Sequence, residues 1–233
     1  MARLESNLGS QYIKDIANGL IRIYAKPRVP KEPFSPGDLI RAVETADLSD
    51  LKQLRCVTIM VVSFMGFLRF DEIANLKWGD IEFNMGFVSL TITKSKTDQL
   101  RDGEKVLIAL SSSSACACTL LRTYQFLSDS NKDDEMFVFR ALCNNKTLRQ
   151  SNRPMSYTSV REVVKNKCIQ LGLDQSKYGV HSLRAGGATE AANRGVPERL
   201  FKRHGRWASD SSKDLYVKDS LRKRLSVSQN LGL

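Results

Sequence analysis

The chain has 233 residues, of which 42% are hydrophobic and 26% charged, and these fractions are ordinary for a folded soluble protein. This length suits one large domain, or one domain with a fragment of a second. The net charge of +11 favours a polyanionic partner, nucleic acid before a membrane surface, although a basic surface can also serve solubility alone.

The cysteines and the N-terminal residues argue against several classes of protein. The five cysteines contain no CxxC pair, and with only two histidines in the chain no zinc pattern can be assembled. The first ten residues lack the apolar run of a secretory signal. The most apolar run, CVTIMVVSFMGFL, has 13 residues and is too short to span a bilayer. We therefore expect free thiols in a reducing compartment, no metal and no membrane partner.

The first predicted helix covers residues 11–24, where Ile13, Ile16, Leu20 and Ile23 share one face. It is followed by AKPRVPKEPFSP, whose four prolines in twelve residues predict a linker or an extended arm. We therefore divide the chain into residues 1–32, a helix with its linker, and residues 33–233, the main domain.

The main domain is predicted to begin with a helix near Ser35, where a serine, a proline and an acidic residue are helix-start signals. A longer helix is expected over about residues 51–76. The period then changes, and the short β-branched runs IEF, FVSLTIT and EKVLIAL predict a three-stranded antiparallel meander. Lys94 and Lys96 would lie near the tip of its second hairpin.

The second half of the chain is predicted to be helical again. CTLLRTYQFLS is one helix, and SYTSVREVVKNKCIQLG is another, with Ser159 and Glu162 at capping-box spacing and Gly172 as its stop. HSLRAGGATEAANRG runs to Gly195, PERLFKRHG follows, and Ser209 is expected to cap a short polar helix that carries Tyr216. The predicted fold class is mainly α with a small three-stranded antiparallel sheet (α+β).

Two arginines have a potential partner three residues away. Arg69 precedes Glu72 by three residues, a spacing that forms either a structural ion pair or a guanidinium braced to face an anion. His181 precedes Arg184 by the same interval at a predicted helix N-terminus, which is a favourable place for a phosphate. The alternative is a satisfied histidine beside a surface arginine.

The stretch HGRWASDSSKDLYVKDS holds Trp207 and Tyr216 nine residues apart among polar residues. A surface tyrosine is the ordinary interpretation, whereas a nucleophilic tyrosine requires nearby cations. His204 begins the stretch but is expected to be a helix-end residue near the carbonyls before Gly205. Lys96 either faces solvent or reaches a phosphate.

The order of these residues resembles the catalytic set of the tyrosine recombinases, the phage-integrase family. GFLRFDEIANLKWGDI is similar to the family's first-arginine box and TKSKTDQ to its β-hairpin lysine segment, while Trp207 follows Arg184 by 23 residues and precedes Tyr216 by nine. The resemblance covers about residues 33–227, with Trp207 where many members have histidine. The segment from His181 onward is most similar to eukaryotic members from Crypton-like and DIRS-like mobile elements, which implies a nuclear protein; the alternative is a cytoplasmic one.

The resemblance implies a fold and a reaction: the recombinase catalytic fold, and transesterification of double-stranded DNA without cofactor through a 3′-phosphotyrosine. Tyr216 would attack a phosphate that Arg69 and Arg184 hold. Lys96 would protonate the leaving oxygen, His181 would assist proton transfer, and Trp207 could only donate a hydrogen bond. Glu72 would orient its neighbours. Three residues are expected as weaker phosphate contacts: Lys94, Arg203 and Arg206.

Two further expectations concern the ends of the chain. Residues 1–32 would be a remnant of the family's core-binding domain. The tail, residues 218–233, would dock on a neighbouring protomer through Leu221, Leu225 and Val227, giving a dimer to tetramer on DNA. The alternatives are a DNA-binding protein that has kept the fold without cutting, such as a domesticated element protein, and a type IB topoisomerase.

Overall fold

The computed structural model describes residues 11–24, 30–92, 104–129, 133–144 and 147–232, and the chain divides into two compact units, Met1–Pro30 and Lys31–Leu233. The first unit contains helix α1, Gln11–Tyr24, as predicted. Its apolar residues are exposed, with 46% of Ile16, 52% of Leu20 and 72% of Ile23 accessible to solvent.

The second unit begins with α2, Pro36–Glu44, whose start follows the predicted signals. The Ser35 hydroxyl accepts a hydrogen bond from the Asp38 backbone N–H at 3.1 Å, and the Asp38 carboxylate accepts one from the Ser35 N–H at 3.0 Å. This capping box satisfies two N–H groups that a helix start leaves without partners.

The long helix predicted over residues 51–76 is two helices, α3 (Leu51–Met65) and α4 (Phe70–Ala74). Phe67 adopts a left-handed backbone with φ 47°, and the Leu68 N–H then reaches the Ser63 carbonyl at 2.9 Å. This is the Schellman closure of a helix end, with phenylalanine where glycine is usual. The break was not predicted, because the apolar periodicity continues through it.

The sheet has the predicted meander, with strands β1 (Ile81–Asn84), β2 (Phe87–Ile92) and β3 (Glu104–Ala109) in the order β1-β2-β3, all antiparallel. A 3₁₀ turn, η2 (Trp78–Asp80), leads into it. A two-stranded hairpin of β4 (Leu142–Cys143) and β5 (Thr147–Leu148) was not predicted, because two-residue strands carry no readable period.

Helices α5 (Ala117–Leu127) and α6 (Tyr157–Gln170) follow the predicted segments, and the 3₁₀ turn η3 (Gln175–Lys177) comes next. The cap of α6 is Ser156, which accepts from the Ser159 N–H at 3.2 Å, so the expected capping role of Ser159 was wrong by three residues. Gly172 ends α6 with φ 70°, as predicted.

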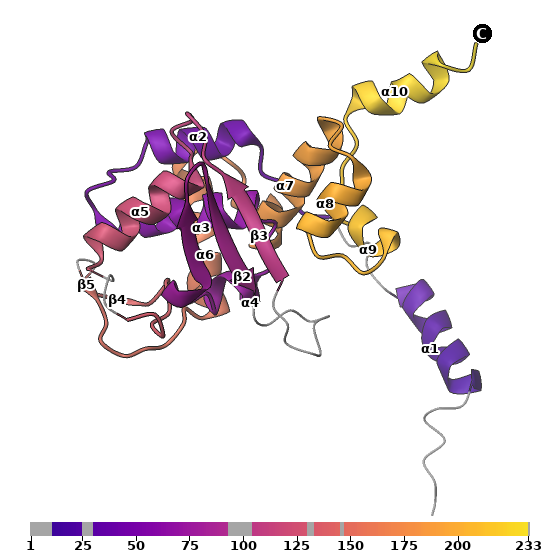
Figure 1. The fold of residues 1–233 in the computed structure, drawn as a ribbon. Helices are drawn as coiled ribbons and strands as arrows, with labels where there is room; N and C mark the ends of the chain where they lie inside the picture. The colour runs from indigo at the N-terminus through magenta and orange to yellow at the C-terminus, as the bar shows by residue number, and fades with distance from the viewer. Residues whose placement is uncertain (1–10, 25–29, 93–103, 130–132, 145–146, 233) are drawn as a thin grey trace, which may run out of the picture. The chain divides into compact units, whose positions relative to one another are not determined.

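The remaining helices are α7 (His181–Asn193), α8 (Glu198–His204), α9 (Asp210–Asp214) and α10 (Leu221–Gln229). Figure 1 shows α7 and α8 adjacent in the second unit. Gly195 closes α7 with φ 77°, as predicted. Within the described ranges, no helix is both long and apolar enough to cross a membrane.

The main core surrounds α3, which is buried on nearly every side. Side chains from α2, α5, α6 and β2 pack on it, and the glycines of α7 let that helix approach closely: a Cβ on Gly186 would overlap the Phe34 carbonyl oxygen and one on Gly187 that of Phe64. A smaller cluster of Phe67, Ala188, Phe201 and Trp207 joins α7 to α8.

The contact between α7 and α3 gives a test of the fold. Gly187→Ala should lower the free energy of unfolding in urea by about 1–3 kcal/mol, because the new Cβ would overlap both the Phe64 carbonyl and the Phe67 ring. Gly179→Ala is the matched control, because a Cβ there meets no atom within 4 Å. Equal stability of the two variants would contradict the close approach.

Candidate active site

One buried carboxylate organises the candidate site. The Glu72 side chain is 1% exposed and accepts hydrogen bonds from Arg69 through both the backbone N–H at 2.7 Å and the guanidinium Nη1 at 2.8 Å. Arg69 is the N-cap of α4 rather than a residue inside a helix, which places its side chain, 22% exposed, at the edge of the site. The predicted pairing of Arg69 with Glu72 is confirmed, but Arg69 caps α4 instead of lying inside the same helix as Glu72.

Arg184, from the first turn of α7, is completely buried. Its guanidinium donates to the backbone carbonyls of Phe67 and Gly205, and its Nη1 lies 3.8 Å from the Glu72 carboxylate. The guanidinium carbon lies 4.5 Å from the Trp207 ring centroid and 5.1 Å from that of Tyr216. The structure therefore joins the two predicted motifs, because the cation of HSLR packs on the aromatics of the C-terminal stretch.

Trp207 is buried, with 6% of it exposed, although its sequence neighbours are polar. Its ring centroid is 6.0 Å from that of Phe67 and 6.3 Å from that of Phe201. Gly205 is required here, because a Cβ on it would overlap the Trp207 ring. The indole Nε1 is buried and has no hydrogen-bond partner among the described residues.

Tyr216 does not lie on a helix, contrary to the prediction. Helix α9, capped by Ser209 as predicted, ends at Asp214, and Tyr216 occupies the turn after it, where its N–H reaches the Lys213 carbonyl at 2.9 Å. The helix stops early because the chain turns back towards α7, where the Thr189 hydroxyl donates to the Tyr216 carbonyl at 3.1 Å. The half-buried phenol ring lies 5.7 Å from Trp207.

Thr189 was missed by the sequence analysis. Its hydroxyl also accepts a hydrogen bond from the Lys218 N–H at 3.0 Å, so one side chain of α7 holds the backbone on both sides of Val217. A threonine inside AGGAT carries no sequence signal for this contact, because its partners are backbone groups 27 and 29 residues away.

His181 is the first residue of α7 and is exposed. Loss of solvent around the ring, followed by repulsion from Arg184 and Arg69, lowers its pKa below the ordinary value of 6.5, while Asp71 opposes the shift. The imidazole is therefore mainly neutral at pH 7, the form that accepts a proton. His204 ends α8 with Nε2 at 2.8 Å from the Met65 carbonyl, in keeping with its expected role as a helix-end residue.

The charged groups shift one another's proton affinities. Burial favours the neutral form of Glu72, but the guanidiniums of Arg206 and Arg69 outweigh it and hold the pKa of the carboxyl below its usual value. Burial and repulsion from Arg69 lower the pKa of Arg184, which still remains protonated at neutral pH. The site therefore holds three cations and one anion.

The three residues expected as phosphate contacts have different outcomes. Arg206 is buried, with its side chain 1% exposed and its Nη2 at 2.7 Å from Glu72, so its guanidinium is paired inside the protein. A phosphate contact by Arg206 stays a prediction, because a positive charge in a basic motif does not reveal which way the side chain turns. Arg203, on α8, is exposed.

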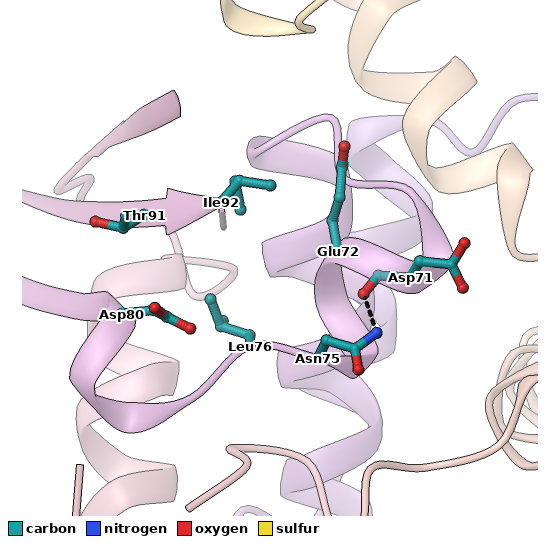
Figure 2. A pocket seen from close by; sticks show the side chains of 7 residues that line it. All are labelled: Asp71, Glu72, Asn75, Leu76, Asp80, Thr91 and Ile92. Carbon is teal, nitrogen blue, oxygen red and sulfur yellow. Dashed lines mark hydrogen bonds between the residues drawn. The ribbon is translucent and has the colours of Figure 1, made fainter. Parts of the chain in front are cut away.

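Lys94 and Lys96 lie outside the described residues. The end of β2 nevertheless borders the site. Thr91 and Ile92 line a cavity of about 10 Å³ together with Asp71 and Glu72 of α4, as Figure 2 shows. Lys94 follows the last residue of β2, Ile92, by two positions in the sequence.

Comparison with known proteins decides the family. The model of the phage integrase family matches residues 37–222. The chain belongs to this family. It is 27% identical over 188 residues to an "Integrase/recombinase xerD homolog" of Selenomonas ruminantium, covering 80% of this chain and 54% of that protein. The chain thus spans about half the length of this curated relative.

Solved recombinase structures share the fold. A post-cleavage complex of XerH with a palindromic difH substrate matches with a TM-score of 0.64 at 17% identity, covering 86% of this chain and 53% of that one. XerA recombinase matches with a TM-score of 0.63 at 16% identity, over 99% of this chain and 78% of that one. A lambda integrase dimer bound to a COC′ core site gives a TM-score of 0.55 at 16% identity, over 91% and 57%.

Metal ligation has no visible basis in the described part of the chain, where no group of three or more His, Cys, Asp or Glu side chains could hold an ion. The site instead offers guanidiniums, an indole N–H, an imidazole and a phenol. These are groups that bind an anionic phosphate and move a proton near it.

The effect of the neighbouring charges on the pKa of His181 can be measured directly. An NMR titration should place the pKa of His181 below 6.5, and Arg69→Met should raise it, because removing a nearby cation favours the imidazolium. His204→Gln assigns the two histidine signals. Arg161→Met, an exposed arginine of α6, should leave the titration unchanged. A wild-type pKa at or above 6.5 would contradict the described surroundings of His181.

Proposed function

We propose that this chain cleaves and rejoins DNA strands as a site-specific tyrosine recombinase, through a 3′-phosphotyrosine intermediate. The observation that carries the proposal is that Arg69 and Arg184 meet at the Glu72 carboxylate, while the rings of Trp207 and Tyr216 pack on the Arg184 guanidinium. Membership of the phage integrase family and the net charge of +11 support it.

The reaction needs no external energy source. The Tyr216 phenolate oxygen forms a bond to phosphorus while the bond from phosphorus to the 5′-oxygen of the next nucleotide breaks. The proton of Tyr216 passes to the neutral imidazole of His181, and Lys96 gives a proton to the departing 5′-oxygen. The number of phosphoester bonds is unchanged, so a 5′-hydroxyl can attack the phosphotyrosine and restore the strand.

The two arginines and the tryptophan stabilise the charge that builds on the phosphate. Guanidiniums present several fixed donors, and donors already in place cost little reorganisation when the transition state forms. The unpartnered indole Nε1 of Trp207 supplies one more donor, but it has no lone pair to act as a base. Glu72 touches no reacting atom in this scheme and holds Arg69 in place by hydrogen bonds.

Double-stranded DNA is the proposed substrate and a dimer or larger assembly on DNA the proposed active form. The similar structures named above include XerH bound to a difH substrate and a lambda integrase dimer bound to a core site. A domesticated, non-cutting protein would keep the fold but lose this constellation, and the family match does not favour a type IB topoisomerase.

The similarity of the segment from His181 onward to Crypton-like and DIRS-like proteins leads us to propose a eukaryotic mobile element as the source and the nucleus as the location. The structure of a Tn1549 transposon integrase with circular intermediate DNA, TM-score 0.58 at 12% identity, is compatible with a mobile-element role. We also propose that residues 1–32 are the remnant of a core-binding domain.

The nucleophile assignment gives the principal test of this function. Tyr216→Phe should abolish the covalent protein–DNA adduct on a nicked suicide substrate, because phenylalanine has no oxygen to attack phosphorus. DNA affinity, measured by fluorescence anisotropy, should change less than about twofold, because the phenol makes no ion pair. Tyr157→Phe, an exposed tyrosine of α6, is the matched control and should still form the adduct. An adduct with the Tyr216 variant would refute the assignment.

The tail is proposed to join protomers. Leu221, Leu225 and Val227 of α10 are 69%, 46% and 68% exposed, and no residue of that helix is buried. Leu221 and Leu225 lie one helical turn apart on the same side of α10, and this exposed pair suits a second copy of the chain.

Deleting residues 221–233 should therefore reduce the assembly on DNA to monomers in analytical ultracentrifugation, while a monomer still binds one half-site. Replacing Arg222 and Arg224 with Gln keeps the apolar side chains and should keep the assembly. An unchanged assembly after the deletion would remove this role from the tail.

A further inference from the structure

Arg206 is a buried arginine that the proposed chemistry does not use. It follows the end of α8, has a left-handed backbone with φ 55°, and its N–H and that of Trp207 close a Schellman turn on the carbonyls of Arg203 and Lys202 at 3.0 and 3.2 Å. Glycine is the usual residue at such a position, because a side chain strains the left-handed backbone. An arginine there indicates a role for the side chain that offsets the strain.

The side chain of Arg206 joins three segments. Its Nη1 donates to the His204 carbonyl at 2.8 Å and to the Gly66 carbonyl at 3.3 Å, and its Nη2 donates to the Phe67 carbonyl at 3.1 Å and to Glu72 at 2.7 Å. The end of α8 is thereby tied both to the end of α3 and to α4. Trp207 is the next residue, so its place over Arg184 depends on this connection.

Arg206 and Arg184 face the same oxygen of Glu72. Oε2 lies 2.7 Å from Nη2 of Arg206 but 3.8 Å from Nη1 of Arg184. The Arg184 guanidinium instead donates through Nη1 to the Phe67 carbonyl and through Nη2 to the Gly205 carbonyl. With Arg206 removed, only the uncharged backbone N–H of Arg69 would hold that oxygen, and the buried carboxylate would attract the Arg184 guanidinium strongly. Arg184 would then move away from the rings of Trp207 and Tyr216.

We propose that Arg206 is a positioning residue that occupies Glu72, so that Arg184 remains available to the phosphate and Trp207 stays above it. It also raises the net charge of the group formed by Arg69, Arg184, Arg206 and Glu72 from +1 to +2, which favours a phosphate that gains charge. The expected effect of Arg206 on the cleavage rate rests on the proposed function. Its effect on the positions of Arg184 and Trp207 does not depend on any reaction.

Arg206→Gly separates the side chain from the backbone. Glycine keeps the left-handed turn and relieves its strain, so a purely backbone role predicts unchanged cleavage. If the guanidinium positions Arg184 and Trp207, the single-turnover rate of adduct formation should fall about 100-fold. This is the effect expected when a catalytic group is displaced by about 1 Å. DNA affinity should change less than about threefold, because the guanidinium is 1% exposed. Unchanged cleavage by the folded glycine variant overturns the proposal.

A double-mutant cycle tests whether Arg206 acts through Glu72. Glu72→Gln removes the charge that would attract Arg184, so the combined Glu72→Gln and Arg206→Gly variant should cleave no more slowly than the slower single variant. Rate losses that multiply in the double variant would show that the two residues act separately, against the proposal. Arg161→Gly on α6 is the arginine control and should cleave at the wild-type rate.

The geometric consequence is read from the indole N–H signals of the two tryptophans in an NMR spectrum, assigned with Trp207→Phe. Arg206→Gly should shift the Trp207 signal and leave that of Trp78, in the main core, unchanged. No shift of Trp207 overturns the proposal. If the wild-type protein forms no DNA adduct, the proposed function is refuted. A shift of the Trp207 signal in Arg206→Gly would still support the positioning role of Arg206 in that case.

Discussion

The site depends on one buried carboxylate shared by three guanidiniums. Glu72 is 1% exposed, and burying an unpaired charge at such a place would cost several kcal/mol. Arg69 and Arg206 satisfy its oxygens by hydrogen bonds, whereas Arg184 is close enough to be attracted and far enough to keep other partners. The three guanidiniums and the one carboxylate of this group therefore leave an excess of two positive charges.

This arrangement requires two helix ends to meet. α3 and α8 both end in a left-handed residue, Phe67 and Arg206, and the side chain of the second donates to the backbone of the first. The glycines of α7 let that helix approach α3, which brings Arg184 between the two turns. Close packing of backbone on backbone thus sets the distances of the charged groups more than the charges themselves do.

Helix boundaries were predictable wherever a cap or a stop has a local chemical cause. Ser35, Gly172 and Gly195 mark such points, and the three strands follow from short β-branched runs. The break between α3 and α4 was missed because its left-handed residue is a phenylalanine inside an apolar run. The turn at Tyr216 was missed because a hydrogen bond from Thr189, distant in sequence, ends the local helix.

By itself, the sequence determined the fold class and the family and predicted the reactive side chains, because periodicity, caps and the spacing of rare residue types are local properties of the chain. Only the tertiary structure decided that Trp207 is buried, that Tyr216 lies in a turn and that Arg206 faces Glu72 instead of solvent. Burial and the direction of a long side chain depend on segments more than 100 residues apart, such as Glu72 and Arg206, and no local pattern encodes them.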